Sequence, residues 1–271
     1  MKPQQMSIAL TGASGGIGAA LARRLTSAGA RMLLIGRSKD ALLALASELS
    51  AGAQNRRRVD ALIVDVTSES GRQAIRDAAQ ARDVNVLINN AGLAGFGPAG
   101  ALDDHETEAV LRTNLLAPIL LTANLLPHLR QQPCAQILNI GSTLGSIGVP
   151  GFSVYGASKA GLRSYSEALR RELADSPVRV QYLAPRSVRT PFNDERVQAF
   201  NAATGSRADS PEWVAQVALR LLQTGRAQCF MGTMEPIAAR LNGALSVLLD
   251  GAFRKHRRAL QQSVLPHGDH R

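Results

Sequence analysis

Three residues in the middle of the chain have the types and spacing that proton transfer needs. Ser142 follows the apolar run Gln136–Ile140, Tyr155 lies thirteen residues further on, and Lys159 lies four residues beyond Tyr155. An i, i+4 spacing places Tyr155 and Lys159 on one face of a helix. A tyrosine hydroxyl has a pKa of about 10 and is a poor base at neutral pH, but a nearby ammonium lowers that pKa. The pattern predicts a site where Ser142 holds a substrate oxygen and Tyr155 transfers a proton, although Tyr-x-x-x-Lys alone is common on ordinary helices.

A glycine-rich segment near the N-terminus has the composition of a phosphate-binding turn. It reads TGASGGIG over residues 11–18, directly after the apolar run Ser7–Leu10 and directly before a helical pattern. Glycines let a backbone turn sharply and approach a pyrophosphate, whose charge is stabilised by a helix N-terminus. The alternative is a tight structural connection between a strand and a helix. We expect dinucleotide binding by this segment, through Gly12, Ser14, Gly16, Ile17 and Gly18.

The end of the second apolar run indicates which dinucleotide is bound. An NAD-binding unit usually has Asp or Glu about 20 residues after the glycines, where it binds the ribose hydroxyls. This chain has Gly36 there, so no carboxylate would repel a 2′-phosphate, and Arg37 follows immediately. A guanidinium forms charge-assisted contacts with phosphate. We therefore expect NADP (NADPH) in preference to NAD, the alternative being that Arg37 merely lies on the solvated rim of the sheet.

Short apolar runs alternate with helical patterns along the chain. Runs without polar alternation are typical of strands buried on both faces of a parallel sheet. The repeated order predicts an α/β fold, a doubly wound Rossmann-like sheet of about seven strands with helices on both faces. Ligands bind such sheets beyond the carboxyl ends of the strands, so the site is expected there. The predicted strands are Ser7–Leu10, Met32–Ile35, Ala61–Val64, Val84–Ile88, Gln136–Ile140, Val178–Leu183 and, at the edge, Cys229–Met231. The predicted helices are Ile17–Ala28, Lys39–Leu49, Glu69–Ala81, Asp104–Leu129, Val154–Leu173, Pro211–Leu222 and one long helix, continuous or broken, over Pro236–Gln262.

The motifs together resemble those of the short-chain dehydrogenase/reductase family. The resemblance covers Met6 to Thr190, roughly two-thirds of the chain. The combination is specific although each motif alone is not. The glycine spacing is similar to that of the single-domain members rather than the extended, epimerase-like ones. In family order the chain has TGASGGIG at 11–18, Asp65-Val66, Asn89-Asn90-Ala91-Gly92, Asn114, Ser142, Tyr155 and Lys159.

The resemblance implies a role for each matching residue. Tyr155 would donate or accept the proton, Ser142 would orient the carbonyl or hydroxyl, and Lys159 would lower the Tyr155 pKa and hold the nicotinamide ribose. Asn114 would lie in a helix irregularity and bind a water that connects Lys159 to solvent, the alternative being a helix-packing amide. Asn89 would tie neighbouring strands together. The remaining matches imply cofactor contacts: Asp65 and Val66 with adenine, Asn90, Ala91 and Gly92 with the adenosine ribose, and Val188 and Thr190 with the nicotinamide carboxamide.

One residue near the expected site departs from the family pattern. The family often has Pro-Gly after the sixth strand, whereas this chain has Pro185-Arg186. The longer side chain could clash with the pocket, alter the loop, or recognise an acidic group of the substrate. The sequence leaves these alternatives open.

The resemblance identifies an enzyme, an NAD(P)-dependent short-chain dehydrogenase/reductase acting on a CH–OH or C=O group. We expect reversible, NADPH-dependent reduction of a carbonyl to an alcohol. The alternative is a cofactor-binding regulator or scaffold without turnover, which would need none of Ser142, Tyr155 and Lys159. The resemblance also implies a homo-oligomer formed through the helices over Asp104–Leu129 and Val154–Leu173. We expect a small, apolar substrate, because candidate pocket residues are mostly apolar, with ordinary packing as the alternative: Leu93, Phe96, Leu144, Ile147, Val149, Phe152 and Phe192.

Composition argues against several other classes of protein: disordered, disulfide-rich, secreted and membrane-spanning. The chain has 271 residues, of which 45% are hydrophobic and 19% charged, enough for a sizeable core. Its two cysteines, Cys134 and Cys229, are far apart and have no His or Cys nearby, so we expect neither a metal site nor a disulfide framework. The N-terminus lacks a signal-peptide pattern, and the most apolar stretch, Leu115–Leu126, is shorter than the ~20 residues that span a bilayer. We expect a cytoplasmic protein.

The formal net charge of +10 is concentrated in two places, the run at 56–58 and the last twenty residues. No nucleic-acid-binding motif accompanies these clusters, so a solvated basic face is favoured over a nucleic-acid partner. We expect a Rossmann-like catalytic domain over 1–235 and, over 236–271, a C-terminal helical extension of the same domain with a basic tail. In that extension Ile237, Leu241, Leu245, Leu248 and Ala252 recur at helical spacing beside Arg254, Lys255, Arg257 and Arg258. Peripheral contact with an anionic membrane is one interpretation. We favour a helix packed on protein, because polar residues interrupt the apolar face and glycines weaken the helix.

Overall fold

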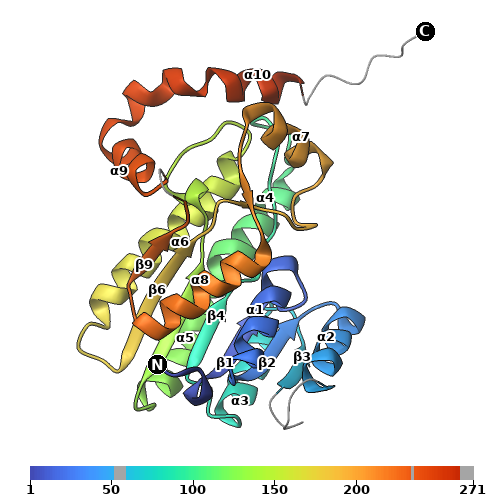
Figure 1. Ribbon diagram of the computed structural model, residues 1–271, viewed down its shortest axis with the longest axis vertical. Coiled ribbons are helices and arrows are strands. Elements are labelled where there is room, and N and C mark those ends of the chain that lie inside the picture. Colours follow the sequence, from blue (N-terminus) through green and yellow to red (C-terminus); the bar gives the residue numbers. More distant parts are fainter. Residues whose placement is uncertain (52–58, 233–234, 263–271) are drawn as a thin grey trace.

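The computed structural model of the chain describes residues 1–51, 59–232 and 235–262, and a seven-stranded sheet forms its centre (Figure 1). All neighbouring strands are parallel, and their order is β3-β2-β1-β4-β5-β6-β9. The order reverses between β1 and β4, which is the place where doubly wound sheets bind ligands. The predicted Rossmann-like fold is therefore confirmed. The strands are β1 (Ser7–Thr11), β2 (Arg31–Gly36), β3 (Val59–Ile63), β4 (Val86–Asn89), β5 (Ala135–Ile140), β6 (Val178–Ala184) and β9 (Gln228–Phe230).

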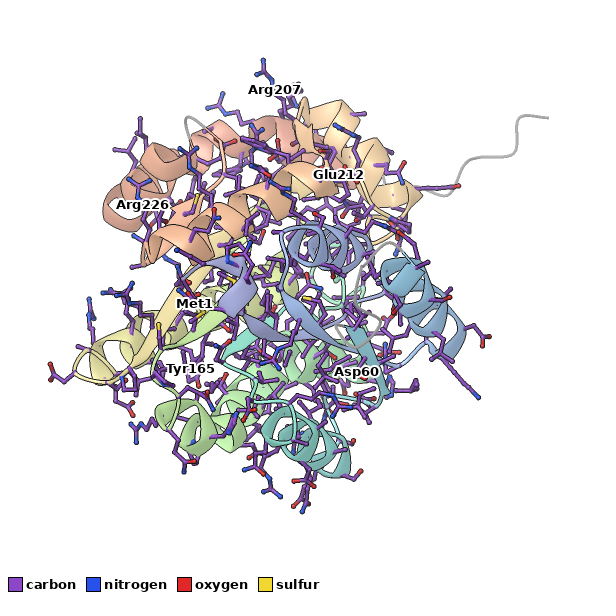
Figure 2. The ribbon with its side chains drawn as sticks, turned by 60° about the horizontal axis from the view of Figure 1, so that its bottom comes forward. Met1, Asp60, Tyr165, Arg207, Glu212 and Arg226 are labelled. Atoms are coloured by element: carbon purple, nitrogen blue, oxygen red, sulfur yellow. The ribbon has the colours of Figure 1, made fainter. Side chains whose placement is uncertain are left out.

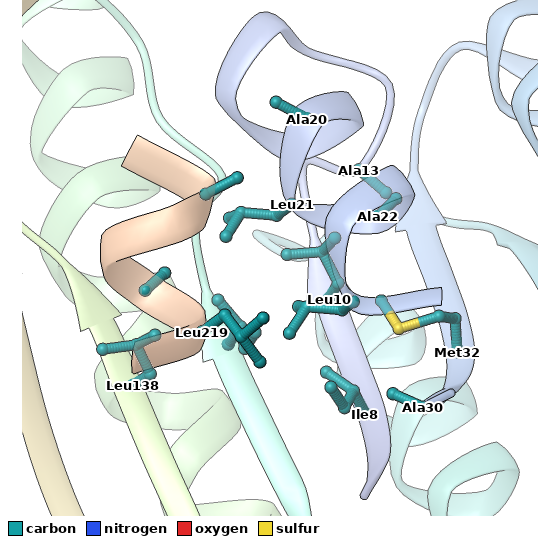
Figure 3. Packing of buried hydrophobic residues seen from close by; sticks show 14 of the residues in the cluster. Ile8, Leu10, Ala13, Ala20, Leu21, Ala22, Ala30, Met32, Leu138 and Leu219 are labelled. Atoms are coloured by element: carbon teal, nitrogen blue, oxygen red, sulfur yellow. The ribbon is translucent and has the colours of Figure 1, made fainter. Parts of the chain in front are cut away.

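Alternate residues of the buried strands point to opposite faces of the sheet, and helices cover both faces. On β1, Ile8 and Leu10 pack with α1 (Gly16–Ser27), α2 (Lys39–Ala51) and α8 (Pro211–Thr224). Figure 3 shows Leu21 of α1 and Leu219 of α8 beside Leu10. Ala9 points to the other face, which α3 (Glu69–Gln80), α5 (Ala117–Arg130) and α6 (Ser153–Glu172) cover. Because both faces are covered, the strand sequences are apolar without alternation.

The predicted helix over 104–129 is divided by a change of hydrogen bonding. It consists of α4 (Asp104–Leu111), a π-helical turn (Arg112–Leu116) and α5. By length and composition alone, the composite helix Asp104–Arg130 could cross a membrane, but 39% of its most apolar window is buried inside the protein. Leu121 and Leu125 are buried in the core against the sheet. Their positions are those of a core helix of the Rossmann-like fold.

Apart from α8, the helices from the last third of the chain gather at one end of the molecule (Figure 1). They are α7 (Glu195–Thr204), α9 (Glu235–Leu245), a 3₁₀ segment (Ser246–Phe253) and α10 (Arg254–Gln262). Ala259 of α10 packs with Phe200 of α7 in a small apolar cluster. The structure thus breaks the predicted helix over 236–262 and packs its last part on the protein, although Ile237 and Leu241 remain about half exposed.

Several expectations differ from the structure or lie outside it. The strand predicted at Val84 begins at Val86, because the Val84 N–H donates to the Ala79 carbonyl in the turn that ends α3. The sequence patterns also missed α7, which begins at an Asp194 cap and ends at Gly205 in a left-handed conformation (φ +75°). The basic run at 56–58, the chain after residue 262, and the side chains of Leu245 and Leu248 are outside what the structure describes.

Candidate active site

The glycine-rich turn has the shape of a nucleotide cradle. Gly12 has a positive φ of +64°, and a Cβ on it would lie 2.8 Å from the Cα of Ala91. A Cβ on Gly18 would lie 2.0 Å from the Gly12 carbonyl oxygen, and one on Gly16 would lie 2.3 Å from the Thr190 Cγ2. The turn leads into the N-terminus of α1, where the first N–H groups have no partner within the helix. The chemistry of this turn fits a pyrophosphate, and its binding there stays a prediction.

The loop after β4 is fastened to this turn by polar side chains. The Asn90 amide donates to the carbonyls of Thr11 and Gly12, each at 3.0 Å. The Thr11 hydroxyl accepts hydrogen bonds from the N–H groups of Asn90 and Ala91. The preceding residue, Asn89, is the last of β4, and its amide donates to the Asn139 side chain of β5 at 2.8 Å. Asn89 therefore joins neighbouring strands, and Asn90 positions the backbone that faces the cradle.

Ser142, Tyr155 and Lys159 converge on the same cavity as the glycine-rich turn. The Ser142 hydroxyl interacts with the Tyr155 hydroxyl and lowers the pKa of Tyr155. The Lys159 ammonium donates to the Ile140 carbonyl at 3.1 Å and lies 5.7 Å from the centre of the Tyr155 ring. Ser142 is held in turn by the Tyr182 hydroxyl, which lies 3.3 Å from both its N–H nitrogen and its carbonyl oxygen. The structure thus brings together the three residues for which the sequence predicts acid–base chemistry.

Burial sets the protonation of this site in a way that the sequence did not predict. Burial raises the pKa of Tyr155 far above its usual value, despite the opposing hydrogen bond to Ser142. Burial also lowers the pKa of Lys159 to about 8. The expected lowering of the Tyr155 pKa by Lys159 is not among these effects: desolvation raises the pKa, and the lowering effect comes from Ser142. At neutral pH, Tyr155 holds its proton and can donate it to a substrate oxygen.

Asn114 lies in the π-helical turn, as its expected place in a helix irregularity requires. Its Oδ1 accepts from the Leu93 N–H at 2.7 Å, and its Nδ2 donates to the Leu93 carbonyl and to the Ser158 hydroxyl. A Cβ on Gly92 would lie 3.2 Å from the Asn114 Oδ1 and 3.8 Å from the Lys159 ammonium. Asn114 is outside the cavity lining, and its side chain connects the loop after β4 to α6 beside Lys159.

Three of the residues expected to bind the adenosine end, Arg37, Asp65 and Val66, lie beyond the cavity lining. Arg37 follows β2 and is 65% exposed, with its guanidinium 4.0 Å from the Asp65 carboxylate. Burial raises the pKa of Asp65. Hydrogen bonds from Thr67 and the charge of Arg37 together lower that pKa by more than burial raises it, so the net shift is downward. A Cβ on Gly36 would lie 3.6 Å from the Ser14 hydroxyl, which places this strand end against the glycine-rich turn. Val66 is buried in the core cluster behind Asp65.

One cavity of about 650 Å³ joins the cradle to the acid–base site. Of the apolar residues expected there, it is lined by Leu144, Val149, Phe152 and Phe192. Leu93, Phe96 and Ile147 are not part of its lining: Phe96 packs behind Phe152, and Ile147 faces a second cavity. The remaining expected lining residues are all present: Gly12, Ser14, Gly16, Ile17, Gly18, Asn90, Ala91, Gly92, Val188 and Thr190.

Sequence patterns missed the far wall of the cavity. It is formed by α7, the segment after it, and the C-terminal helices. Arg207 is exposed at this side of the molecule (Figure 2). The residues of this wall follow the last family motif in the chain, so the spacing of the motifs could not predict them. They are Val197, Phe200, Asn201, Ser206, Arg207, Glu235 and His256. Within the described ranges, His, Cys, Asp and Glu side chains form no group of three that could hold a metal ion.

Arg186 has two acidic partners at the edge of the cavity. Its guanidinium makes two hydrogen bonds to the Asp209 carboxylate, at 2.5 and 3.2 Å, and a third to the Glu235 carboxylate at 3.2 Å. The Asp209 side chain is only 9% exposed. Arg186 therefore fastens the loop after β6 to the short strand β8 (Ala208–Asp209) and to the start of α9.

Known proteins are similar to this chain in sequence and in architecture. A family model described as short chain dehydrogenase matches residues 7–200. Sulfoacetaldehyde reductase 2 of Chromohalobacter salexigens is 37% identical over 201 residues, which are 73% of this chain and 78% of that protein. A Sphingobium yanoikuyae short-chain dehydrogenase in complex with NADPH is 28% identical, with a TM-score of 0.77 over 90% of this chain and 96% of that one. A Burkholderia phymatum relative in complex with NAD has a TM-score of 0.80 at 24% identity, over 92% of this chain and 96% of that one.

The chain belongs to the short-chain dehydrogenase/reductase family. It is an NAD(P)-dependent oxidoreductase acting on CH–OH and C=O groups. The resemblance drawn from the sequence motifs is thereby confirmed.

Proposed function

We propose that this protein is an NADPH-preferring carbonyl reductase that works on an apolar substrate and runs in reverse as an alcohol dehydrogenase. The observation that supports it most is the convergence of Ser142, Tyr155 and Lys159 on one cavity with the glycine-rich cradle. A bound nicotinamide supplies the hydride. The chain itself binds, orients and manages the proton.

Each residue of the site has a distinct part in this proposal. Ser142 holds the substrate carbonyl oxygen, and Tyr155 donates its proton to that oxygen as the alcohol forms. The raised pKa of Tyr155 keeps the proton in place until it is needed. Lys159 holds the nicotinamide ribose and supplies positive charge below the phenol. Asn114 is a positioning residue that holds the loop after β4 and, through a water, connects Lys159 to solvent.

Preference for NADPH rests on the end of β2. Gly36 leaves no carboxylate at the strand end, and the exposed Arg37 has a single, loose ion pair with Asp65. An exposed ion pair of this kind contributes little to stability, so Arg37 is able to exchange it for a 2′-phosphate. In the same proposal, Asp65 and Val66 contact adenine, Asn90 to Gly92 line the adenosine ribose, and Val188 and Thr190 bind the carboxamide.

The cavity wall supports an apolar substrate. Leu144, Val149, Phe152 and Phe192 lie beside the reacting end. Arg186 is a partly buried cation on the loop after β6, but its guanidinium already has two carboxylate partners. Of the three alternatives for Arg186, the structure therefore favours a role in shaping the loop over recognition of an acidic group.

A screen of NADPH oxidation tests the proposal. The panel comprises aliphatic, steroidal, aromatic and acyl-thioester ketones, each with NADPH and with NADH. We expect turnover of apolar ketones and a higher kcat/KM with NADPH. A protein that binds NADPH but turns over none of the four classes would instead fit the regulator or scaffold alternative.

A further inference from the structure

The main chain of Ser142 is held from outside the cavity by a side chain of the neighbouring strand. The Ser142 N–H donates to the Tyr182 hydroxyl, and the same hydroxyl donates to the Ser142 carbonyl oxygen, each at 3.3 Å. Tyr182 belongs to β6, is only 3% exposed and lies outside the cavity lining. One buried hydroxyl thus satisfies both polar main-chain groups of Ser142.

The residue before Ser142 leaves room for this hydroxyl. A Cβ on Gly141 would lie 2.1 Å from both the Cζ and the hydroxyl oxygen of Tyr182. The φ of Gly141 is not positive, so this glycine provides space for a close approach rather than an unusual backbone conformation. Any side chain at 141 would displace the Tyr182 ring or the end of β5, and the contact with Ser142 would be lost.

The Tyr182 hydroxyl is able to donate and accept at the same time because it keeps its proton. Burial raises the pKa of Tyr182 to about 12, against smaller lowering effects of the Ser142 main chain and the charge of Arg163. A protonated phenol has one donor and can also accept. The Tyr182 ring packs beside Phe230 of β9, with 6.3 Å between ring centres, so packing as well as hydrogen bonding sets the place of the hydroxyl.

The chain that follows Ser142 is fastened to the main chain of Ser142 and to a helix. The Leu144 N–H donates to the Ser142 Oγ at 3.1 Å, and the Asn242 amide of α9 donates to the Ser146 carbonyl at 3.0 Å. The position of the Ser142 hydroxyl therefore depends on its own main chain and on the short segment behind it. Tyr182 is the side chain that fixes the first residue of this segment.

We propose that Tyr182 is a positioning residue for carbonyl reduction, whose hydroxyl fixes the main chain of Ser142 and so aims the Ser142 hydroxyl at the substrate oxygen beside Tyr155. The inference rests on the proposed function, in which Ser142 holds that oxygen, and adds the residue that holds Ser142. A misplacement of about 1 Å can cost ~10²-fold in rate. Tyr182 therefore affects turnover although it does not touch the substrate.

Tyr182→Phe tests the inference, because it removes the hydroxyl and keeps the ring. We expect kcat to fall about tenfold for a ketone that the wild type reduces, with KM for NADPH unchanged because the glycine-rich turn is not altered. Tyr165→Phe removes the hydroxyl of another partly buried tyrosine outside the cavity lining and should keep the wild-type kcat. Wild-type kcat in Tyr182→Phe would overturn the inference.

A double-mutant cycle with Ser142→Ala separates positioning from a general loss of structure. Residues that act through one another have non-additive effects. Tyr182→Phe should therefore lower kcat in the wild type but change it by less than about twofold in the Ser142→Ala background. An equal loss in both backgrounds would overturn the inference. Wild-type kcat in Ser142→Ala alone would instead contradict the proposed role of Ser142, and the inference with it.

Hydrogen exchange at the Ser142 amide provides a readout that does not require turnover. The Tyr182 hydroxyl is the acceptor of this N–H, so exchange should be faster in Tyr182→Phe and unchanged in Tyr165→Phe. Faster exchange in a protein without turnover would contradict the proposed function while supporting the contact. Unchanged exchange in Tyr182→Phe would overturn the contact and the inference.

Discussion

The ammonium of Lys159 lies 5.7 Å from the centre of the Tyr155 ring, one helical turn along α6. Both residues are at the buried end of the cavity, and Lys159 itself is only 4% exposed. Its ammonium donates a hydrogen bond to the neutral carbonyl of Ile140. A cation in this position strengthens the interactions of the site with electron-rich groups but is costly to desolvate.

This cost makes the stability of the protein depend on pH. The folded-state pKa of Lys159 is lowered to about 8, so the unfolded chain binds more protons between pH 8 and the ordinary lysine value near ~10.4. Relative to Lys159→Met, the wild type should therefore gain about 2–3 kcal/mol in free energy of unfolding as the pH rises from 7 to 10. Urea denaturation across this pH range measures the difference. The exposed Lys39→Met is the matched control and should show no comparable gain; parallel pH curves for wild type and Lys159→Met would contradict the prediction.

Arg37 should determine the choice of cofactor. Removing a charge-assisted contact with the 2′-phosphate by Arg37→Ala should weaken NADPH binding by about ten- to a hundredfold, equivalent to ~1.5–3 kcal/mol. NADH binding should change much less. Calorimetric titration of each dinucleotide measures both affinities. Arg31→Ala removes an exposed cation at the opposite end of β2 and is the control; equal affinity of the wild type for NADH and NADPH would refute the preference.

Arg186 should matter more for stability than a surface arginine does. Arg186→Met leaves the nearly buried Asp209 without its ion pair and releases Glu235 at the start of α9. We expect a loss of about 1–3 kcal/mol in free energy of unfolding. Urea titration measures it, with Arg189→Met on the same loop as control, because Arg189 is exposed and its guanidinium donates to the main-chain carbonyl of Ala208. A loss no greater than that of the control would show that the two ion pairs do not fasten the loop.

The exposed apolar side chains of α4 and the π-helical turn should lie in a subunit interface. Leu111 and Leu116 are 37% and 43% exposed on the helices through which we expect a homo-oligomer to form. Light scattering should therefore give a mass above that of one chain, and Leu116→Glu should lower it by placing a charge in the contact. Leu43→Glu, at a similarly exposed position of α2, should leave the mass unchanged. A monomeric wild type would remove the expectation.

Local rules predicted most of the fold and most of the cofactor side of the site. Buried parallel strands have uniformly apolar sequences, and this leaves a signal in the sequence. So do the glycines of the turn, because a Cβ would meet backbone at Gly12 and Gly18 and the Thr190 side chain at Gly16. The π-helical turn at Asn114 came from the family resemblance, because nothing in residues 112–116 distinguishes it from an ordinary helix.

The substrate side could not be predicted in the same way. The helix α7 has a cap at Asp194 and a terminating glycine at Gly205, and these two signals could have revealed it. His256 reaches the cavity because the 3₁₀ segment changes the direction of the chain before α10. That placement depends on packing between segments about 50 residues apart, such as Phe200 and His256, and no local pattern reports it.

Substitution of Tyr155 by Phe tests the central claim most directly, because it removes one hydroxyl from the acid–base site. The variant should keep the fold and NADPH binding and lose about 10²–10⁴-fold in kcat for a ketone that the wild type reduces. Tyr165→Phe makes the same change on the same helix outside the cavity lining and should leave kcat unchanged. Comparison of kcat and NADPH affinity for the wild type and both variants is the measurement. Loss of turnover in Tyr155→Phe with NADPH binding intact is the predicted result, and full turnover in that variant would contradict the account.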